Sequence, residues 1–74
     1  MKMSELQDKD IINVKDGKNI GKIIDLDITN DGLINYIIAE PSSFFRFNSF
    51  NKETNIKFNQ IVRIGKDVIL VELD

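Results

Sequence analysis

Apolar and polar residues alternate along much of the chain, and the alternation is clearest in the first half. Ile24, Leu26 and Ile28 are separated by Asp25 and Asp27. Because successive side chains of a β-strand point to opposite faces, this spacing predicts a strand with one buried and one solvated face. The apolar residues are rich in isoleucine and valine, whose branched side chains favour strands. The pattern therefore predicts an all-β protein.

Turn-forming residues divide this pattern into five to six short strands. Glycine-containing turns are expected at 16–17, 30–32 and 65–67, because glycine accepts a positive φ without steric cost. The expected strands are 11–14, 20–28, 33–39, 56–58, 62–64 and 68–73. Residues 42–54 are expected to form a long loop or a loose hairpin. An open sheet of such strands has two unpaired edges, so we expect a small closed or nearly closed barrel of SH3-like size.

A few single positions refine this picture. Gly21, inside an expected strand, predicts a bulge or a close backbone approach. Pro41 ends the strand before it, because proline has no N–H to donate. Ser4 and Gln7 have the spacing of a capping box, which predicts one helical turn with Leu6 packed inward. A second tight helical turn is expected at 59–61.

Composition limits the chemistry that the chain can carry out. Its 74 residues suffice for a single domain, 1–74, and they include neither cysteine nor histidine. We therefore expect no disulfide, no zinc site and no cofactor. The net charge is -2, with the charges interspersed, so nucleic-acid binding is not favoured. No apolar run is long enough to span a membrane and no signal peptide opens the chain, which together favour a cytoplasmic protein, or one held at a membrane only through a partner.

Short motifs spread over the chain resemble those of the PRC-barrel domain, and more narrowly the single-domain sporulation proteins of the YlmC/YmxH type. The matching motifs are Ser4-x-Leu6, 9–14, Asp16-Gly17, 20–23, Asp25-Leu26, Asp31-Gly32, Ile34, Ile37-Ile38, Ile56-x-Phe58-x-x-Ile61 and Ile64-Gly65-x-Asp67-Val68-Ile69-Leu70-Val71. The chain departs from the family pattern at Lys57-Phe58, where Pro-Trp is common, and at Gln60, where an acid is common. Phe58 is expected to keep an aromatic plug in the barrel.

The resemblance implies a small β-barrel like those of the photosynthetic reaction-centre H subunit and of a ribosome maturation factor. In both proteins the domain is a binding or assembly module. The family supplies no catalytic residues, and its sporulation label gives no partner. The resemblance thus implies a non-enzymatic protein-interaction module, associated with sporulation.

The most conspicuous candidate surface is a phenylalanine-rich stretch between Pro41 and Asn55. It consists of Phe44, Phe45, Arg46, Phe47 and Phe50, and it holds four of the five phenylalanines of the chain. One interpretation is that one or two rings close the end of the barrel while the others pack on the loop. The alternative is a partner-docking or self-association surface, because exposed aromatic residues beside arginine are typical of interfaces. Insertion into a membrane surface is the weakest alternative.

Two acidic patterns are weaker candidates. The segment 27–32 resembles part of a calcium-binding loop, but Ile38 stands where the bidentate acid should be, so a plain hairpin turn is expected. Asp25 and Asp27 share one strand face as a catalytic carboxylate pair would. Alternation with apolar residues places both in solvent, and no phosphate loop or nucleophile motif accompanies them. We therefore expect no enzymatic activity.

The remaining alternative is a ribosome- or RNA-associated module. Arg46, Lys52 and Lys57 lie near phenylalanines on which bases could stack. The acidic composition argues against it. We therefore expect an interaction or assembly module with an unknown protein partner. A homodimer is also expected, because so short a chain gains stability by burying apolar surface against its own copy.

Overall fold

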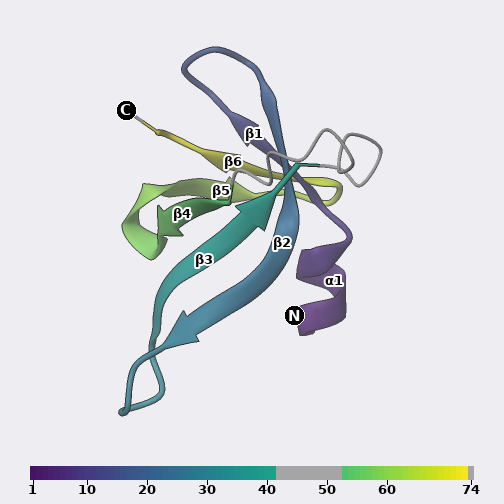
Figure 1. Ribbon diagram of the computed structural model, residues 1–74. Helices are drawn as coiled ribbons and strands as arrows, with labels where there is room; N and C mark the ends of the chain where they lie inside the picture. Colours follow the sequence, from purple (N-terminus) through teal and green to yellow (C-terminus); the bar gives the residue numbers. More distant parts are fainter. Residues whose placement is uncertain (42–52, 74) are drawn as a thin grey trace.

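The computed structural model describes residues 1–41 and 53–73 (Figure 1). Its elements are α1 (Met3–Gln7), β1 (Asp10–Asn13), β2 (Asn19–Ile28), β3 (Ile34–Glu40), β4 (Thr54–Lys57), the 3₁₀ turn η2 (Phe58–Gln60), β5 (Ile61–Ile64) and β6 (Val68–Val71). The prediction of an all-β fold with five to six short strands is confirmed.

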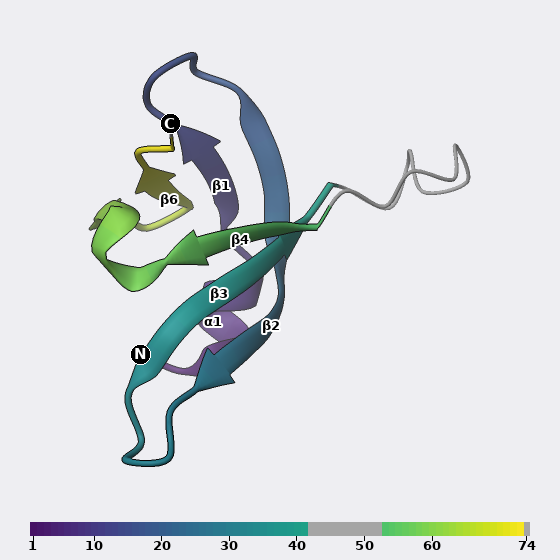
Figure 2. The same cartoon turned by 60° about the vertical axis from the view of Figure 1, so that its left-hand side comes forward.

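The strands form one curved sheet in the order β4-β3-β2-β1-β6-β5 (Figure 2). Neighbouring strands are antiparallel except β1 and β6, which pair in parallel with Ile11 opposite Ile69. The hairpin of β5 and β6, predicted from the turn at 65–67, is confirmed. The longest pair, β2 and β3, extends beyond the other strands and ends in a turn that stands apart from the sheet (Figures 1 and 2).

The core lies on the inner face of this curved sheet. Its buried apolar side chains, among the described residues, are Ile11, Ile23, Ile37, Ala39, Ile56, Ile69 and Val71. They come from five strands at alternate positions, as the period of two predicts. The predicted inward packing of Leu6 is confirmed, since it lies against this core from α1.

Gly21 marks a close approach between the start of β2 and the end of β3. Its φ is +116°, and a Cβ built there would lie 1.9 Å from the carbonyl oxygen of Glu40. No side chain fits at that distance, so the predicted close backbone approach is confirmed. A register shift between Ile23 and Asp25 follows within the same strand, which adds the local bend expected of a β-bulge.

Two helical turns differ from the prediction in register. The first helix begins at Met3, and the side chain of Glu5, not of Gln7, accepts a hydrogen bond from the backbone N–H of Lys2 at 2.6 Å. The capping pair, Lys2 and Glu5, is therefore two positions before the predicted pair, and Ser4 lies inside the helix. The second turn occupies 58–60 instead of 59–61, because Gln60 Oε1 accepts from the backbone N–H of Lys57 at 2.9 Å.

Candidate functional site

The phenylalanine-rich candidate surface, made of Phe44, Phe45, Arg46, Phe47 and Phe50, lies outside the described residues. Its role as a plug or as a docking surface stays a prediction. The site described below was not among the sequence predictions. It lies at the free end of the β2–β3 hairpin.

Large apolar side chains are exposed together at this end. Leu33 is 64% exposed, Ile28 58% and Phe58 50%. With Gly32 and Ile34, Leu33 and Phe58 line an open hollow of about 410 Å³. We call Ile28, Leu33, Ile34 and Phe58 the apolar tip. Grouped exposure of this kind is more informative than single surface leucines, which are normal.

The backbone explains why these residues meet. Ile28 at the end of β2 is paired with Ile34 at the start of β3, and Leu33 directly precedes that pair. Phe58 arrives from another part of the chain, because η2 folds back onto β3 immediately after β4. The prediction that Phe58 belongs to a strand and plugs the barrel is wrong on both counts. Its ring lies half-exposed at the rim of the hollow, because η2 turns the chain before the side chain can point into the core.

Hydrogen bonds hold the turn of the hairpin in one conformation. The backbone N–H of Thr29 donates to the carbonyl of Leu33 at 2.8 Å, and that of Gly32 donates to the carbonyl of Thr29 at 2.9 Å. The Thr29 hydroxyl also accepts from the N–H of Leu33 at 3.0 Å. Gly32 has a φ of +89°, as the predicted hairpin turn requires. The exposed Leu33 is therefore presented by a fixed turn.

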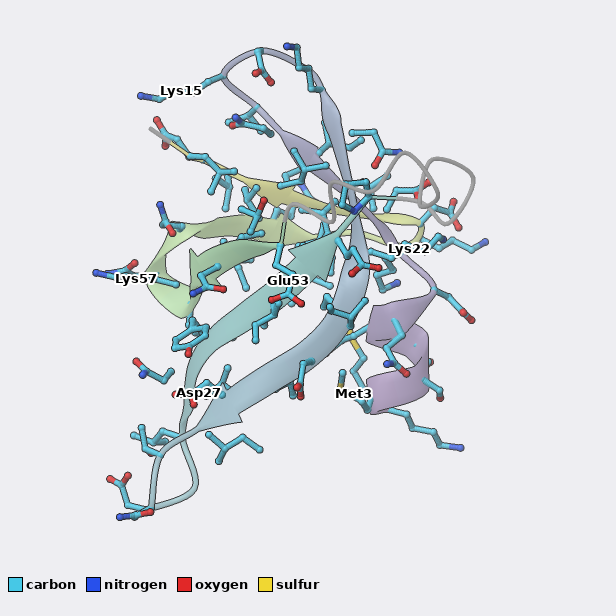
Figure 3. The ribbon with its side chains drawn as sticks, in the orientation of Figure 1. Met3, Lys15, Lys22, Asp27, Glu53 and Lys57 are labelled. Atoms are coloured by element: carbon cyan, nitrogen blue, oxygen red, sulfur yellow. The ribbon has the colours of Figure 1, made fainter. Side chains whose placement is uncertain are left out.

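Two opposite charges flank the apolar tip. The Thr29 hydroxyl donates to the carboxylate of Asp31 and, with the backbone N–H of Asp31, lowers the pKa of this exposed acid. Asp31 is consequently ionised at neutral pH. Lys57, next to Phe58, is exposed and has no ion pair within 1–41 and 53–73. In Figure 3 its side chain extends outward from the corner between β4 and η2. The tip thus has an acid at its turn and a base at its other border.

A second hollow, also of about 410 Å³, is polar and lies between α1, β1 and the β5–β6 turn. It is lined by Glu5, Asp8, Lys9, Asp10, Lys66 and Asp67. The Lys9 ammonium is largely buried there and donates to the backbone carbonyl of Lys66. Lys22 reaches the same region, 3.4 Å from an oxygen of Asp10. These contacts join the residues at the start of β1 to the β5–β6 turn and to β2, and in the described part of the chain no three metal-ligating side chains cluster.

The carboxylates weighed as a catalytic pair have separate local partners. Asp25 accepts from the backbone N–H of Leu26 at 2.8 Å, whereas Asp27 accepts from the side-chain amide of Asn35 at 3.0 Å. The segment 27–32 forms the hairpin end and turn described above, as expected for the plain alternative to a calcium loop. Among the residues that the structure describes, no helix is long and apolar enough to cross a membrane.

Comparison with known proteins agrees with this architecture. The chain belongs to the PRC-barrel domain family, whose match spans residues 1–74. It is 38% identical over 73 residues to the probable sporulation protein YlmC of Bacillus subtilis (strain 168), an alignment that covers 96% of this chain and 90% of that protein. The predicted PRC-barrel resemblance and the small barrel fold are therefore confirmed, as is the relation to the probable sporulation protein YlmC.

Proposed function

We propose that the protein is a non-enzymatic protein-interaction or assembly module of spore formation, and that the apolar tip is its binding surface. The observation that carries this proposal is the exposure of Leu33 and Phe58 around one hollow, with the exposed Ile28 beside them through its pairing with Ile34. Apolar patches that remain open to water are typical of interaction sites. The relation to YlmC supports the association with sporulation.

The absence of catalysis is part of the proposal. The chain has no histidine or cysteine to act as a base or nucleophile near neutral pH. The carboxylates of Asp25 and Asp27 accept hydrogen bonds from different neighbours, the backbone N–H of Leu26 and the side-chain amide of Asn35. A protein surface with a fixed apolar centre and charged borders is instead suited to binding another protein.

The ribosome- or RNA-associated alternative has less support. Lys57 is the one base described beside the apolar tip, while Asp31 and Asp27 lie on the same hairpin. Phosphate binding depends on several lysine or arginine contacts, and nearby carboxylates oppose it. We therefore retain a protein partner as the proposed function.

Complementation in the spore-forming host tests this proposal. A deletion strain would receive the wild-type gene, a Leu33→Asp variant or a Val14→Asp control, and heat-resistant spores would be counted. Val14 is a matched control because it is 44% exposed but lies by the β1–β2 turn, at the end of β2 opposite to the apolar tip (Figure 1). We expect Leu33→Asp to give the deletion phenotype and Val14→Asp to restore sporulation. Full restoration by a folded Leu33→Asp protein would contradict the proposal.

A further inference from the structure

We infer that the apolar tip binds a second copy of this chain across a two-fold axis, with Leu33 of each copy seated in the hollow of the other. The inference rests on the proposed function only in that it uses the same surface. It names the occupant of that surface, which neither the family nor the relationship to YlmC specifies.

The shape of the tip is suited to reciprocal insertion. Leu33, which is more exposed than Ile28, lies beside a hollow bordered by Ile34 and Phe58. In a two-fold interface both copies use the same surface patch. A protruding side chain next to an apolar hollow suits this symmetry, because the side chain of each copy can enter the hollow of the other. Ile28, paired with Ile34, widens the apolar area around this contact.

The charges at the borders of the tip are complementary in the same arrangement. Asp31 lies two residues before Leu33, and Lys57 directly precedes Phe58. When the two hairpin ends cross in opposite directions, Leu33 enters the partner's hollow and Asp31 comes to the side where the partner's Lys57 lies. Each copy therefore supplies one acid and one base, which gives two ion pairs. Such pairs at an interface rim fix its register more than they add affinity.

The fixed conformation of the turn lowers the cost of binding. Thr29 holds the backbone of Leu33 at both its N–H and its carbonyl, so this residue loses little freedom on association. Preorganisation of this kind improves affinity because less conformational entropy is lost. Leu33 is thus a suitable central contact residue, because its conformation is already fixed before binding.

The size of the tip sets the expected strength of the dimer. The exposed apolar patches of soluble monomers rarely exceed a few hundred Å² in area. Two patches of that area, one from each copy, bury less surface than the roughly 1,200 Å² of a standard stable interface. We therefore expect a weak dimer that exchanges with the monomer and whose population rises with protein concentration.

Sedimentation equilibrium of the full chain, over a concentration series up to the millimolar range, tests the inference. We expect a monomer–dimer equilibrium for the wild type and for the Val14→Asp control. Leu33→Asp should weaken the dimer by about a hundredfold or more, because it would place a charge in an apolar contact. A wild type that stays monomeric throughout, or a dimer unaffected by Leu33→Asp, would overturn the inference.

Charge reversal tests the crossing direction. Lys57→Glu should weaken the dimer by about tenfold, because it replaces attraction to the partner's Asp31 by repulsion. The double variant Lys57→Glu with Asp31→Lys should restore most of the loss, and thermal melting checks that each variant is folded. If the double variant dimerises no better than Lys57→Glu alone, the proposed arrangement is wrong.

The two proposals fail in different ways. A monomeric wild type combined with a sporulation defect of Leu33→Asp would overturn the dimer and leave the interaction function, with a different protein as the partner. A dimer that Leu33→Asp abolishes without any loss of spores would support the dimer and contradict the proposed function.

Discussion

The two ends of the β2–β3 hairpin are built from the same strands but differ in how closely their residues are packed. At one end, Gly21 lies against the backbone of Glu40 so closely that any side chain is excluded. At the other end, Leu33 and Ile28 project into solvent from a turn that hydrogen bonds hold in place. The first end is determined by internal packing, whereas at the second end Ile34 packs against the core but Ile28 and Leu33 remain mostly exposed. This difference is what supports the proposal that the exposed apolar side chains make an external contact.

Gly21→Ala gives the largest expected loss of stability, and it should act only at the hairpin end where Gly21 packs against Glu40. The added Cβ would clash with the carbonyl of Glu40, and alanine is strained at a φ of +116°. We expect a loss of about 3 kcal/mol or more in the free energy of unfolding, enough to unfold a domain of marginal stability. Chemical denaturation measures this.

The matched control for Gly21→Ala is Gly17→Ala, because Gly17 also has a positive φ of +72° but has open space where a Cβ would stand. Only the conformational strain remains there, so the loss should be about 1 kcal/mol. Equal losses in the two variants would show that close packing at Gly21 is not the cause.

Thr29→Ala should have a smaller effect, confined to the exposed end. It removes the hydroxyl that accepts from the N–H of Leu33 and donates to Asp31. We expect about 1 kcal/mol less stability from the lost bond to the Leu33 N–H, and a weaker dimer, because Leu33 would no longer be fixed. Denaturation and sedimentation measure the two effects separately. Unchanged dimerisation would contradict the role given to preorganisation.

The pH dependence of this variant sharpens the comparison further. The Thr29 hydroxyl lowers the pKa of Asp31 in the folded state. The stabilisation from this hydrogen bond is therefore fully present above the pKa that Asp31 has in the unfolded chain, about 4, and it is lost as pH falls through the lower pKa of the folded protein. The stability difference between wild type and Thr29→Ala should therefore narrow in acid. Titration of the Asp31 carboxyl by NMR should show its pKa rising in the variant, and an identical pKa in both proteins would contradict this cause.

The sequence was informative wherever the signal is local. Alternation around Asp25 and Asp27 predicted β2, and the glycine of the turn at 30–32 predicted the hairpin. The predicted buried face of β2 was wrong in part, because Ile24 and Ile28 are exposed and a register shift between Ile23 and Asp25 interrupts the alternation. Gly21 predicted a bulge or a close backbone approach, because glycine inside a strand often marks one or the other. The parallel pairing of β1 with β6 was not predicted, since residues more than fifty positions apart leave no local trace of their register.

The apolar tip was missed for a related reason. Leu33 was assigned to a strand and Phe58 to the barrel interior, because an apolar residue in a sequence does not indicate whether its side chain is covered. That depends on η2, which turns the chain at Phe58, and on the length by which the hairpin exceeds the other strands. The helical turn expected at 59–61 was the signal nearest to this corner, but it gave no indication that the Phe58 side chain would be exposed.

The central claim, that the apolar tip is a contact surface between copies of this chain, is tested most directly by two-dimensional NMR of the backbone amides at rising protein concentration. The account predicts shifts that grow with concentration and are confined to residues 28–34 and 57–60, with none in the Leu33→Asp protein. Concentration-independent spectra, or shifts centred elsewhere on the sheet, would contradict it.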